Sequence, residues 1–322
     1  MTRGSIFQSV QVGAETTAGT AVAASKRLLG LSIEPKNKAE TKLFRPMGSK
    51  FKTVGTMNKE WSEAALSGPI TYTDIVYALC SGLVNVAPTG TTAKTWVFAP
   101  ALSAADAIKT LTVESGDVTR AQKFAYGITN ALTLKFSRSG CDLSGSMIGK
   151  AAIDGITLTA TPTDVALIPV MPTQVSYKFA DTQAGLAGAA VLTNVIDSEW
   201  SIADRFKPAW FMDGTTSYAS HVETEAKLNV KFRMEADATA LGFLATMRAA
   251  ATKFMRIEAT GGLISGGDYY SLKIDTALKM TEPTSYEDAD GVFAYGWNAE
   301  GAYDSTWTKT TEITVVNTLA AL

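Results

Sequence analysis

Histidine and cysteine are scarce in this sequence, and their scarcity excludes the commonest metal sites. His221 is the single histidine among 322 residues, and Cys80 and Cys141 are the two cysteines, far apart and outside any CxxC pair. The sequence therefore cannot supply the ligands of a multi-histidine metal site. Two cysteines make no disulfide scaffold, and Cys80 lies on an apolar helical pattern, so it is expected to be a buried, reduced thiol. We expect neither a metal nor another cofactor.

A charge excess and a long apolar run are also missing. Lys and Arg number 29 against 31 Asp and Glu, a formal net charge of −2, whereas proteins that bind duplex DNA are usually basic. No run approaches the roughly 20 apolar residues of a membrane span, and residues 1–5 contain no apolar signal segment. We therefore expect no membrane span and synthesis in the cytoplasm. The low charged fraction, 19%, fits either a surface covered by partners or an ordinary globular protein.

Catalytic fingerprints are the third absence. No G-x-S-x-G elbow occurs, and residues 145–150 (GSMIGK) miss the phosphate-loop spacing and the Ser or Thr after the lysine. The acidic residues 287–291 (EDADG) lack the full ligand series of a calcium loop. A glycosidase using only carboxylates stays open, although no pair stands out. The sequence therefore favours a structural or binding protein rather than an enzyme.

What the sequence does contain is a strand–helix–strand unit at residues 221–257. Apolar and polar residues alternate with the period of a half-buried strand. The apolar members are Ala226, Leu228, Val230, Phe232 and Met234. Asp237 is placed to cap a helix over residues 238–251, with Leu241, Leu244 and Ala245 on one side. A second strand is expected from Phe254 onward.

The same pattern occurs earlier, at an offset of 162 residues. The matching segments are 59–83 with 221–245, 44–46 with 206–208 and, at a drifted offset of 169, 124–127 with 293–296. This repeat predicts two tandem domains, residues 1–160 and 161–322, joined by a proline-containing linker at about 160–172. Each half reads as several strands with one helix. The predicted fold is a β-dominated α+β protein of two β-sandwich or barrel domains, each with one flanking helix.

Two polar segments of the first half have no clear periodicity. Residues 12–25 are rich in Gly, Ala and Thr and are expected to form a flexible N-terminal arm that becomes ordered on a partner. A strand containing Leu29, Leu31 and Ile33 is expected to end at Pro35. The basic stretch 36–59 is then predicted to be a long loop, and loops of that length tend to be functional. Contact with DNA and a solvated or inter-subunit role are both open, with the second favoured.

Soft motifs along nearly the whole chain resemble the major tail tube proteins of tailed bacteriophages of the siphophage type. The resembling segments are 11–23 (QVGAETTAGTAVA), 46–48 (PMG), 61–72, 200–210 (WSIADRFKPAW), 257–261 (IEATG) and 270–275 (YSLKID). The resemblance implies tube domains built as β-sandwiches with a flanking helix. Such domains associate into rings, and the rings stack into the tail tube through which DNA is ejected.

For this chain the resemblance implies a virion protein of the tail, synthesised in the host cytoplasm. Its implied partners are further copies of itself, the tape measure protein, the tail terminator and tip proteins, and DNA in transient, non-specific passage. The arm and the long loop are the expected contacts between stacked rings. The inter-ring candidates are Gly13, Glu15, Thr17, Gly19, Lys42, Arg45 and Lys50. Glu63 and Glu225, equivalent at the repeat offset, are the candidate lumen carboxylates, although they could equally lie on an outer face.

Two questions are left open by the sequence. A ring could contain three two-domain chains in a pseudo-sixfold arrangement, which we favour, or six chains with one half outside the channel. The chain could alternatively be a tail-tip or carbohydrate- or host-binding β-sandwich, if Trp210, Tyr218, Trp297 and Trp307 cluster on exposed loops.

Overall fold

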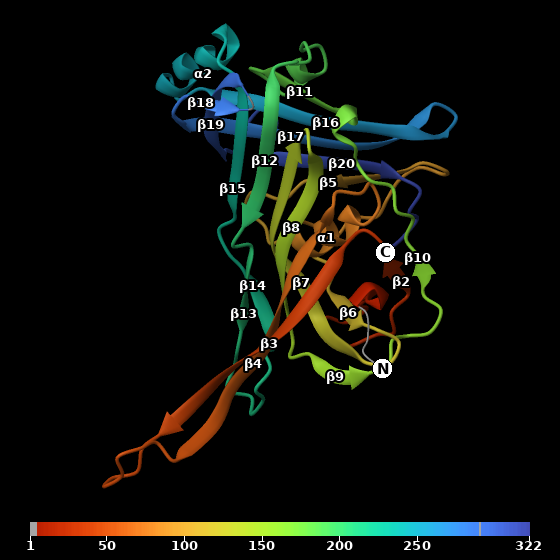
Figure 1. The fold of residues 1–322 in the computed structure, drawn as a ribbon, viewed down its shortest axis with the longest axis vertical. Coiled ribbons are helices and arrows are strands. Elements are labelled where there is room, and N and C mark those ends of the chain that lie inside the picture. Colours follow the sequence, from red (N-terminus) through yellow and green to blue (C-terminus); the bar gives the residue numbers. More distant parts are fainter. Residues whose placement is uncertain (1–4, 290) are drawn as a thin grey trace.

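Strands dominate the fold, which is described by a computed structural model covering residues 5–289 and 291–322. The molecule is elongated: a β-rich body carries a long hairpin that projects from one end (Figure 1). Two α-helices lie in the described part of the chain, one in each half. The predicted β-dominated α+β class is confirmed.

The first half contains ten strands and one α-helix among its described residues. They are β1 (Ser9–Ala14), β2 (Lys26–Leu28), β3 (Ser32–Phe44), β4 (Val54–Pro69), α1 (Ile75–Gly82), β5 (Lys94–Phe98), β6 (Leu111–Gly116), β7 (Ala121–Ser137), β8 (Gly140–Gly149), β9 (Ile153–Ile156) and β10 (Thr163–Asp164). A short 3₁₀ turn, η1 (Ser5–Phe7), precedes β1.

The second half follows with a similar set. Its elements are β11 (Val175–Ala180), β12 (Val195–Ala203), β13 (Phe206–Ala209), β14 (Ser220–Glu223), β15 (Lys227–Glu235), α2 (Ala238–Arg248), β16 (Thr252–Ser265), β17 (Asp268–Pro283), β18 (Glu287–Ala289), β19 (Val292–Gly301) and β20 (Thr311–Asn317). Two further 3₁₀ turns are η2 (Pro172–Gln174) and η3 (Ala184–Leu186).

One strand topology occurs twice in the chain. In the first half the antiparallel pairings run β1–β6–β7–β8–β4–β3. In the second half they run β11–β16–β17–β19–β15–β12, with the strands and the helix in the same order along the chain. The match of residues 59–83 with 221–245 therefore falls on the equivalent units β4–α1 and β15–α2. The match of 124–127 with 293–296 was misleading, because it joins β7 to β19, which occupy different places in the two topologies.

The halves are hydrogen-bonded to one another rather than hanging from a free linker. β12 pairs antiparallel with β7, and β20 pairs with both β17 and β5. Within residues 160–172, Val170 N donates to Ile70 O and Tyr72 N donates to Ile168 O. One buried cluster spans both halves. The division into two domains stays a prediction, but the linker segment is packed against the first half.

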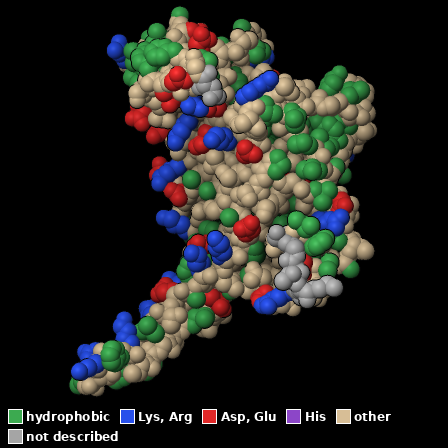
Figure 2. Space-filling model, viewed as in Figure 1, with side chains coloured by type: hydrophobic (Ala, Val, Ile, Leu, Met, Phe, Trp, Pro, Cys, Tyr) green, Lys and Arg blue, Asp and Glu red, His purple; other side chains and the backbone are tan. Residues whose placement is uncertain are grey.

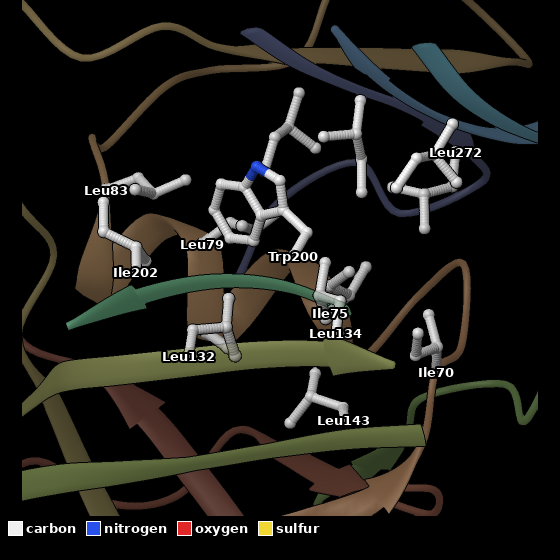
Figure 3. Packing of buried hydrophobic residues seen from close by; sticks show 14 of the residues in the cluster. Ile70, Ile75, Leu79, Leu83, Leu132, Leu134, Leu143, Trp200, Ile202 and Leu272 are labelled. Carbon is white, nitrogen blue, oxygen red and sulfur yellow. The ribbon is translucent and has the colours of Figure 1, made fainter. Parts of the chain in front are cut away.

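Trp200 of β12 shows how that shared core is built. Its indole lies among side chains of α1, including Ile75 and Leu79, and of β7, including Leu134 (Figure 3). Its Nε1 donates to Thr276 Oγ1 at 3.2 Å, so the polar atom is satisfied although the ring is fully buried. A helix of the first half therefore packs against a strand of the second.

The strand–helix unit of the second half agrees with the sequence in the buried face of its strand and in its helix cap, but α2 ends at Arg248 rather than 251 and Ala226 lies just before β15. Leu228, Val230, Phe232 and Met234 are buried, and Asp237 caps α2 by accepting a hydrogen bond from Ala240 N at 2.9 Å. Of the side expected to be apolar, Leu244 is half-buried against the core but Leu241 is not. Phe243 makes the main contact instead, with ring centroids 5.6 Å from Phe232 and 6.1 Å from Trp297. Positions two apart on a helix point to nearly opposite sides, so Leu241 is 45% exposed.

Candidate assembly surfaces

The predicted long loop at residues 36–59 is wrong: this stretch belongs to a β-hairpin. β3 and β4 pair from Ser32–Ser67 out to Phe44–Val54. Pro35 does not end β3, because β3 has β4 as its one paired strand in the described chain and the missing N–H can face the open edge. The sequence did not predict this hairpin because its outer part has no buried face. Alternation of apolar and polar residues indicates that one face of a strand is buried, not that the strand is paired.

The outer part of the hairpin stands away from the body. Residues 36–57 are exposed apart from Ser49, which is half-buried (Figures 1 and 2). Two cross-strand ion pairs, Lys38–Glu63 at 3.6 Å and Lys59–Glu40 at 3.9 Å, are exposed and contribute little. An isolated two-stranded hairpin is at best marginally stable in water. This one is therefore suited to being covered by another surface.

The hairpin tip, residues 42–54, combines apolar and basic side chains. Its exposed apolar residues are Leu43, Phe44, Met47, Phe51 and Val54. Its basic residues are Lys42, Arg45, Lys50 and Lys52, with no acidic residue between Glu40 and Glu60. The turn is held by Arg45 Nη1, which donates to Ser49 O at 2.6 Å. Three of the predicted inter-ring candidates, Lys42, Arg45 and Lys50, are exposed here.

A second hairpin, β13–β14, braces the root of the first. Glu60 N donates to Thr216 O at 2.9 Å, and Thr216 Oγ1 donates to Glu60 Oε1 at 2.6 Å. Trp210 packs edge-on against Trp61 with centroids 5.7 Å apart, and Lys59 Nζ lies 4.7 Å from the Trp210 ring centroid. The β13–β14 hairpin comes directly before β15 in the chain. The outer part of the β3–β4 hairpin likewise comes directly before the inner part of β4, the strand equivalent to β15. Each half therefore directs one hairpin to the same end of the molecule (Figure 1).

The predicted flexible arm at residues 12–25 is instead largely built into the fold. Gly13 lies in β1, where a Cβ would approach Ala23 O to 2.6 Å. Glu15 is 2% exposed and accepts hydrogen bonds from Gly19 N at 2.7 Å, Thr112 Oγ1 at 2.9 Å and Tyr126 N at 2.8 Å. Gly13 and Glu15 are both buried in the single chain. That they contact another ring stays a prediction, and it would require this segment to rearrange.

The remaining predicted site residues are dispersed. Thr17 is exposed and Gly19 half-buried on the loop after β1. Glu63 is exposed on β4, where Trp61 Nε1 donates to its carboxylate at 3.0 Å. Glu225 is exposed but lies between β14 and β15, not on a strand as Glu63 does, although the repeat offset makes the two equivalent. Whether Glu63 and Glu225 face a channel stays a prediction.

The four aromatic residues considered for a carbohydrate site do not form a platform. Tyr218 and Trp297 are each 1% exposed. Trp210 and Trp307 are half-buried and pack edge-on against other rings, Trp307 against Phe254 at 5.8 Å between centroids. These side chains therefore pack against neighbouring parts of the protein rather than forming a flat exposed surface for a sugar. Their edge-to-face contacts are the arrangement that aromatic pairs commonly adopt.

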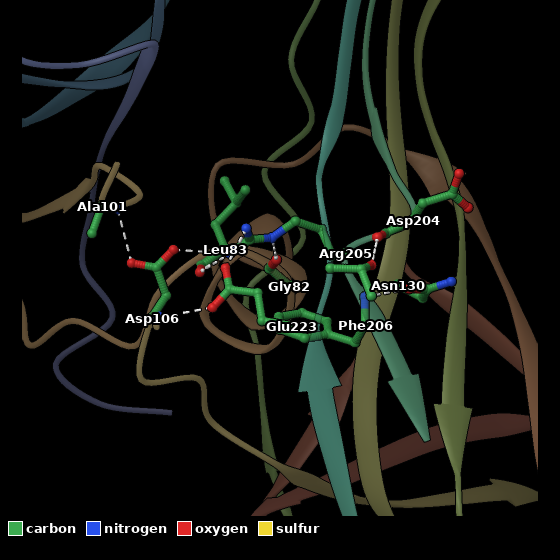
Figure 4. Close-up of polar contacts among 10 residues, drawn as sticks. Gly82, Leu83, Ala101, Asp106, Asn130, Asp204, Arg205, Phe206 and Glu223 are labelled. Carbon is green, nitrogen blue, oxygen red and sulfur yellow. Dashed lines mark hydrogen bonds and ion pairs between the residues drawn. The ribbon is translucent and has the colours of Figure 1, made fainter. Parts of the chain in front are cut away.

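A buried ionic cluster that sequence patterns do not indicate lies where the halves meet (Figure 4). Arg205 forms ion pairs with Asp106 at 3.0 Å and Glu223 at 2.6 Å. Its guanidinium also donates to the carbonyls of Gly82 at 3.2 Å and Leu83 at 3.0 Å, at the C-terminal end of α1. A cation is favourable there because the helix dipole places partial negative charge at that end. The cluster is internally satisfied, which suits a structural junction better than a catalytic site.

His221 is likewise engaged in packing. Its Nδ1 lies 3.1 Å from Tyr126 Oη, and its ring packs at 90° to Phe206. Burial lowers the pKa of His221. Among residues 5–289 and 291–322, no group of three or more His, Cys, Asp or Glu side chains is placed to hold a metal ion.

No protein-family model matches the chain, and no curated protein matches its sequence. In the described residues, no helix has both the length and the apolar character needed to cross a membrane. The tail-tube resemblance therefore rests on the sequence segments quoted above.

Proposed function

We propose that this protein is a structural subunit that polymerises into the tail tube of a siphophage-type virion. The observation that carries the proposal is the projecting β3–β4 hairpin, whose outer part is solvent-exposed and ends in an apolar, basic tip. Ordering such a hairpin in water gains little from burial, so its length and apolar tip are best accounted for by contact with another subunit. The role is structural rather than enzymatic.

The position of the hairpin favours an open polymer. It leaves the body at one end of the long axis (Figure 1), so its contact surface differs from the surface at the other end. A contact between two different surfaces is heterologous, and it generates a filament when the subunit rotation does not close. Rings stacked along an axis are one such arrangement.

The repeated topology supports the three-chain ring. If each chain supplies two equivalent strand–helix domains, three chains supply six domains and can close a pseudo-sixfold ring. Joining the domains around the ring would also cover strand edges that are otherwise exposed. Six chains per ring remain the alternative. A channel wall poor in clustered Lys and Arg would let DNA slide, because phosphate contacts that release counterions hold DNA tightly. Glu63 and Glu225 remain the lumen candidates.

The other partners follow from the same proposal. A tube in a virion tail would contact the tape measure protein inside and the terminator and tip proteins at its ends. DNA would pass through it transiently and without sequence preference. Subunits would be made in the host cytoplasm.

Electron microscopy of the purified chain tests the proposal. The test variant replaces residues 44–54 with Asn-Gly, which closes β3 and β4 with a two-residue turn and removes most of the tip. The matched control is Leu102→Ser, which removes an exposed apolar side chain outside the hairpin. The full chain and the control should form tubes, and the shortened variant should stay a folded, monodisperse particle. Tubes from the shortened variant, or no tubes from the full chain, would overturn the proposal, and reconstruction of tubes would count the chains per ring.

A second candidate is a tail-tip or carbohydrate-binding module. One observation favours it: Tyr286 and Phe293 are exposed and stacked, with centroids 4.8 Å apart and planes at 11°. Exposed rings of this kind can stack on sugars. This second function would be favoured if the chain does not polymerise but binds a glycan, and if Phe293→Ala abolishes that binding.

A further inference from the structure

The end of the molecule opposite the hairpin carries its own exposed apolar surface. We define the end platform as Tyr286, Val292 and Phe293, which are 51%, 41% and 62% exposed. Tyr286 also stacks on Tyr295, with centroids 4.7 Å apart. The β18–β19 pairing holds the platform, and Ala236 N donates to Phe293 O at 2.9 Å just before α2. The platform is thus a built surface rather than a loose loop.

Acidic residues accompany the platform. Residues 280–308 contain no Lys or Arg, whereas residues 41–59 of the hairpin contain no Asp or Glu. Glu287 and Asp288 lie between the platform residues and are exposed. Glu287 pairs with Arg233 at 3.1 Å, and Asp288 accepts from Gly291 N at 2.7 Å. Each contact is exposed to solvent, so carboxylate oxygens remain accessible to an incoming cation.

The two surfaces are complementary and lie at opposite ends of the molecule. The hairpin tip is apolar and basic, and the end platform is apolar and acidic. Figure 1 shows β18, β19 and α2 at one end of the long axis and the β3–β4 tip at the other, and Figure 2 shows basic side chains along the projecting hairpin. A contact between them would bring Lys and Arg to carboxylates and to the faces of aromatic rings, both of which attract cations.

We infer that the end platform is the docking site for the β3–β4 hairpin tip of a second copy of this chain. The inference rests on the proposed function and names the acceptor surface of its polymer contact. Each chain then has one donor and one acceptor, so copies join head to tail. Because Tyr286, Val292 and Phe293 would be covered in the polymer, their exposure in the single chain is explained without a sugar ligand.

Engineered cysteines give the direct test. Both native cysteines are buried, so they should not compete for oxidation. The chain carrying Met47→Cys and Val292→Cys places one thiol at the tip and one at the platform. Met47→Cys with Leu102→Cys is the matched control, since Leu102 is exposed outside the platform. Under mild oxidation of polymerised protein, the first variant should give a ladder of disulfide-linked multimers on non-reducing gels. A ladder from the control alone, or from neither variant, would overturn the inference.

Charge exchange provides an independent readout that separates the inference from the proposed function. Glu287→Lys with Asp288→Lys should raise the protein concentration needed for assembly by about tenfold, and Lys50→Glu with Lys52→Glu should do the same. Combining all four changes should restore assembly, which a general loss of stability would not do. Tubes formed at unchanged concentration by every variant would refute this acceptor surface while leaving the tube function standing. Failure of the unmodified chain to polymerise at all would refute both.

Discussion

Arg205 and Asp106, 99 residues apart in the chain, form an ion pair 3.0 Å long at the meeting of the two halves. Their side chains are 6% and 4% exposed. Asp106 also accepts a hydrogen bond from Ala101 N at 2.9 Å, and its own N–H donates to Glu223 at 2.9 Å. The pair therefore fixes the loop before β6 against the connection between β12 and β13.

Replacing Arg205 with Met should destabilise the protein by about 3–5 kcal/mol, because two buried carboxylates lose their cation. Urea unfolding followed by tryptophan fluorescence measures this. The matched variant Arg205→Met with Asp106→Asn and Glu223→Gln should lose less stability, since no unpaired charge remains. A single variant as stable as the unmodified chain would show that the cluster does not join the halves.

Phe232→Ala should cost about 3–5 kcal/mol, because Phe232 is buried against Phe179 and Phe243 at 5.1 and 5.6 Å between centroids. Leu241→Ala on α2 is the control and should change stability by less than about 0.5 kcal/mol, since Leu241 is exposed. Thermal or urea unfolding of both variants gives the comparison. The opposite ranking would mean that α2 packs through its Leu241 side.

The two outcomes on β15 and α2 show what the sequence could and could not predict. The alternation in β15 reports burial directly, so Phe232 was placed correctly. For α2 the pattern placed Leu241 and Leu244 on one side, but the side chain that enters the core is Phe243, because it meets the rings of β15 and β19. The positions of those rings depend on the tertiary structure and cannot be read from the local sequence of the helix. The hairpin was missed for a related reason: residues 36–57 pair but are not buried, and only burial leaves a periodic trace.

The exposure of the candidate contact residues could be predicted only in part. Arg45 lies in a basic stretch without apolar periodicity, and such a stretch is expected to be exposed, as it is. Glu15 was misplaced because a polar Gly/Ala/Thr segment looks unstructured until the buried partners of the carboxylate are known. The Arg205 cluster could not be foreseen, since its members are far apart in the chain.

Glu15→Ala should destabilise the first half by about 1–3 kcal/mol for each buried donor it leaves unpaired. The donors are the N–H groups of Gly19 and Tyr126 and the hydroxyl of Thr112. Thr17→Ala, on the same loop but exposed, is the control and should leave stability nearly unchanged. Hydrogen exchange of the Tyr126 amide offers a local readout. Unchanged protection in Glu15→Ala would show that the loop is held by other contacts.

Asp74 should make the stability of the protein fall as pH rises through the acid range. Burial raises the pKa of Asp74 to about 6, although its carboxylate accepts a hydrogen bond from Gly30 N at 2.7 Å. An unfolded aspartate titrates near about 3.9, so between about pH 4 and 6 the folded chain binds more protons than the unfolded chain. The stabilisation from the protonated carboxyl is therefore complete below about pH 4 and is lost as pH passes about 6.

Asp74→Asn tests this linkage, because the amide keeps an acceptor for Gly30 N and cannot titrate. Urea unfolding of both proteins at intervals from pH 4 to pH 8 should show the difference, variant minus unmodified chain, increasing with pH and levelling off above about pH 6. Other carboxylates contribute to both curves equally and cancel in that difference. A difference that stays constant with pH, or that decreases, would mean that Asp74 is ionised in the fold at no cost, and that α1 tolerates a buried charge at its first turn.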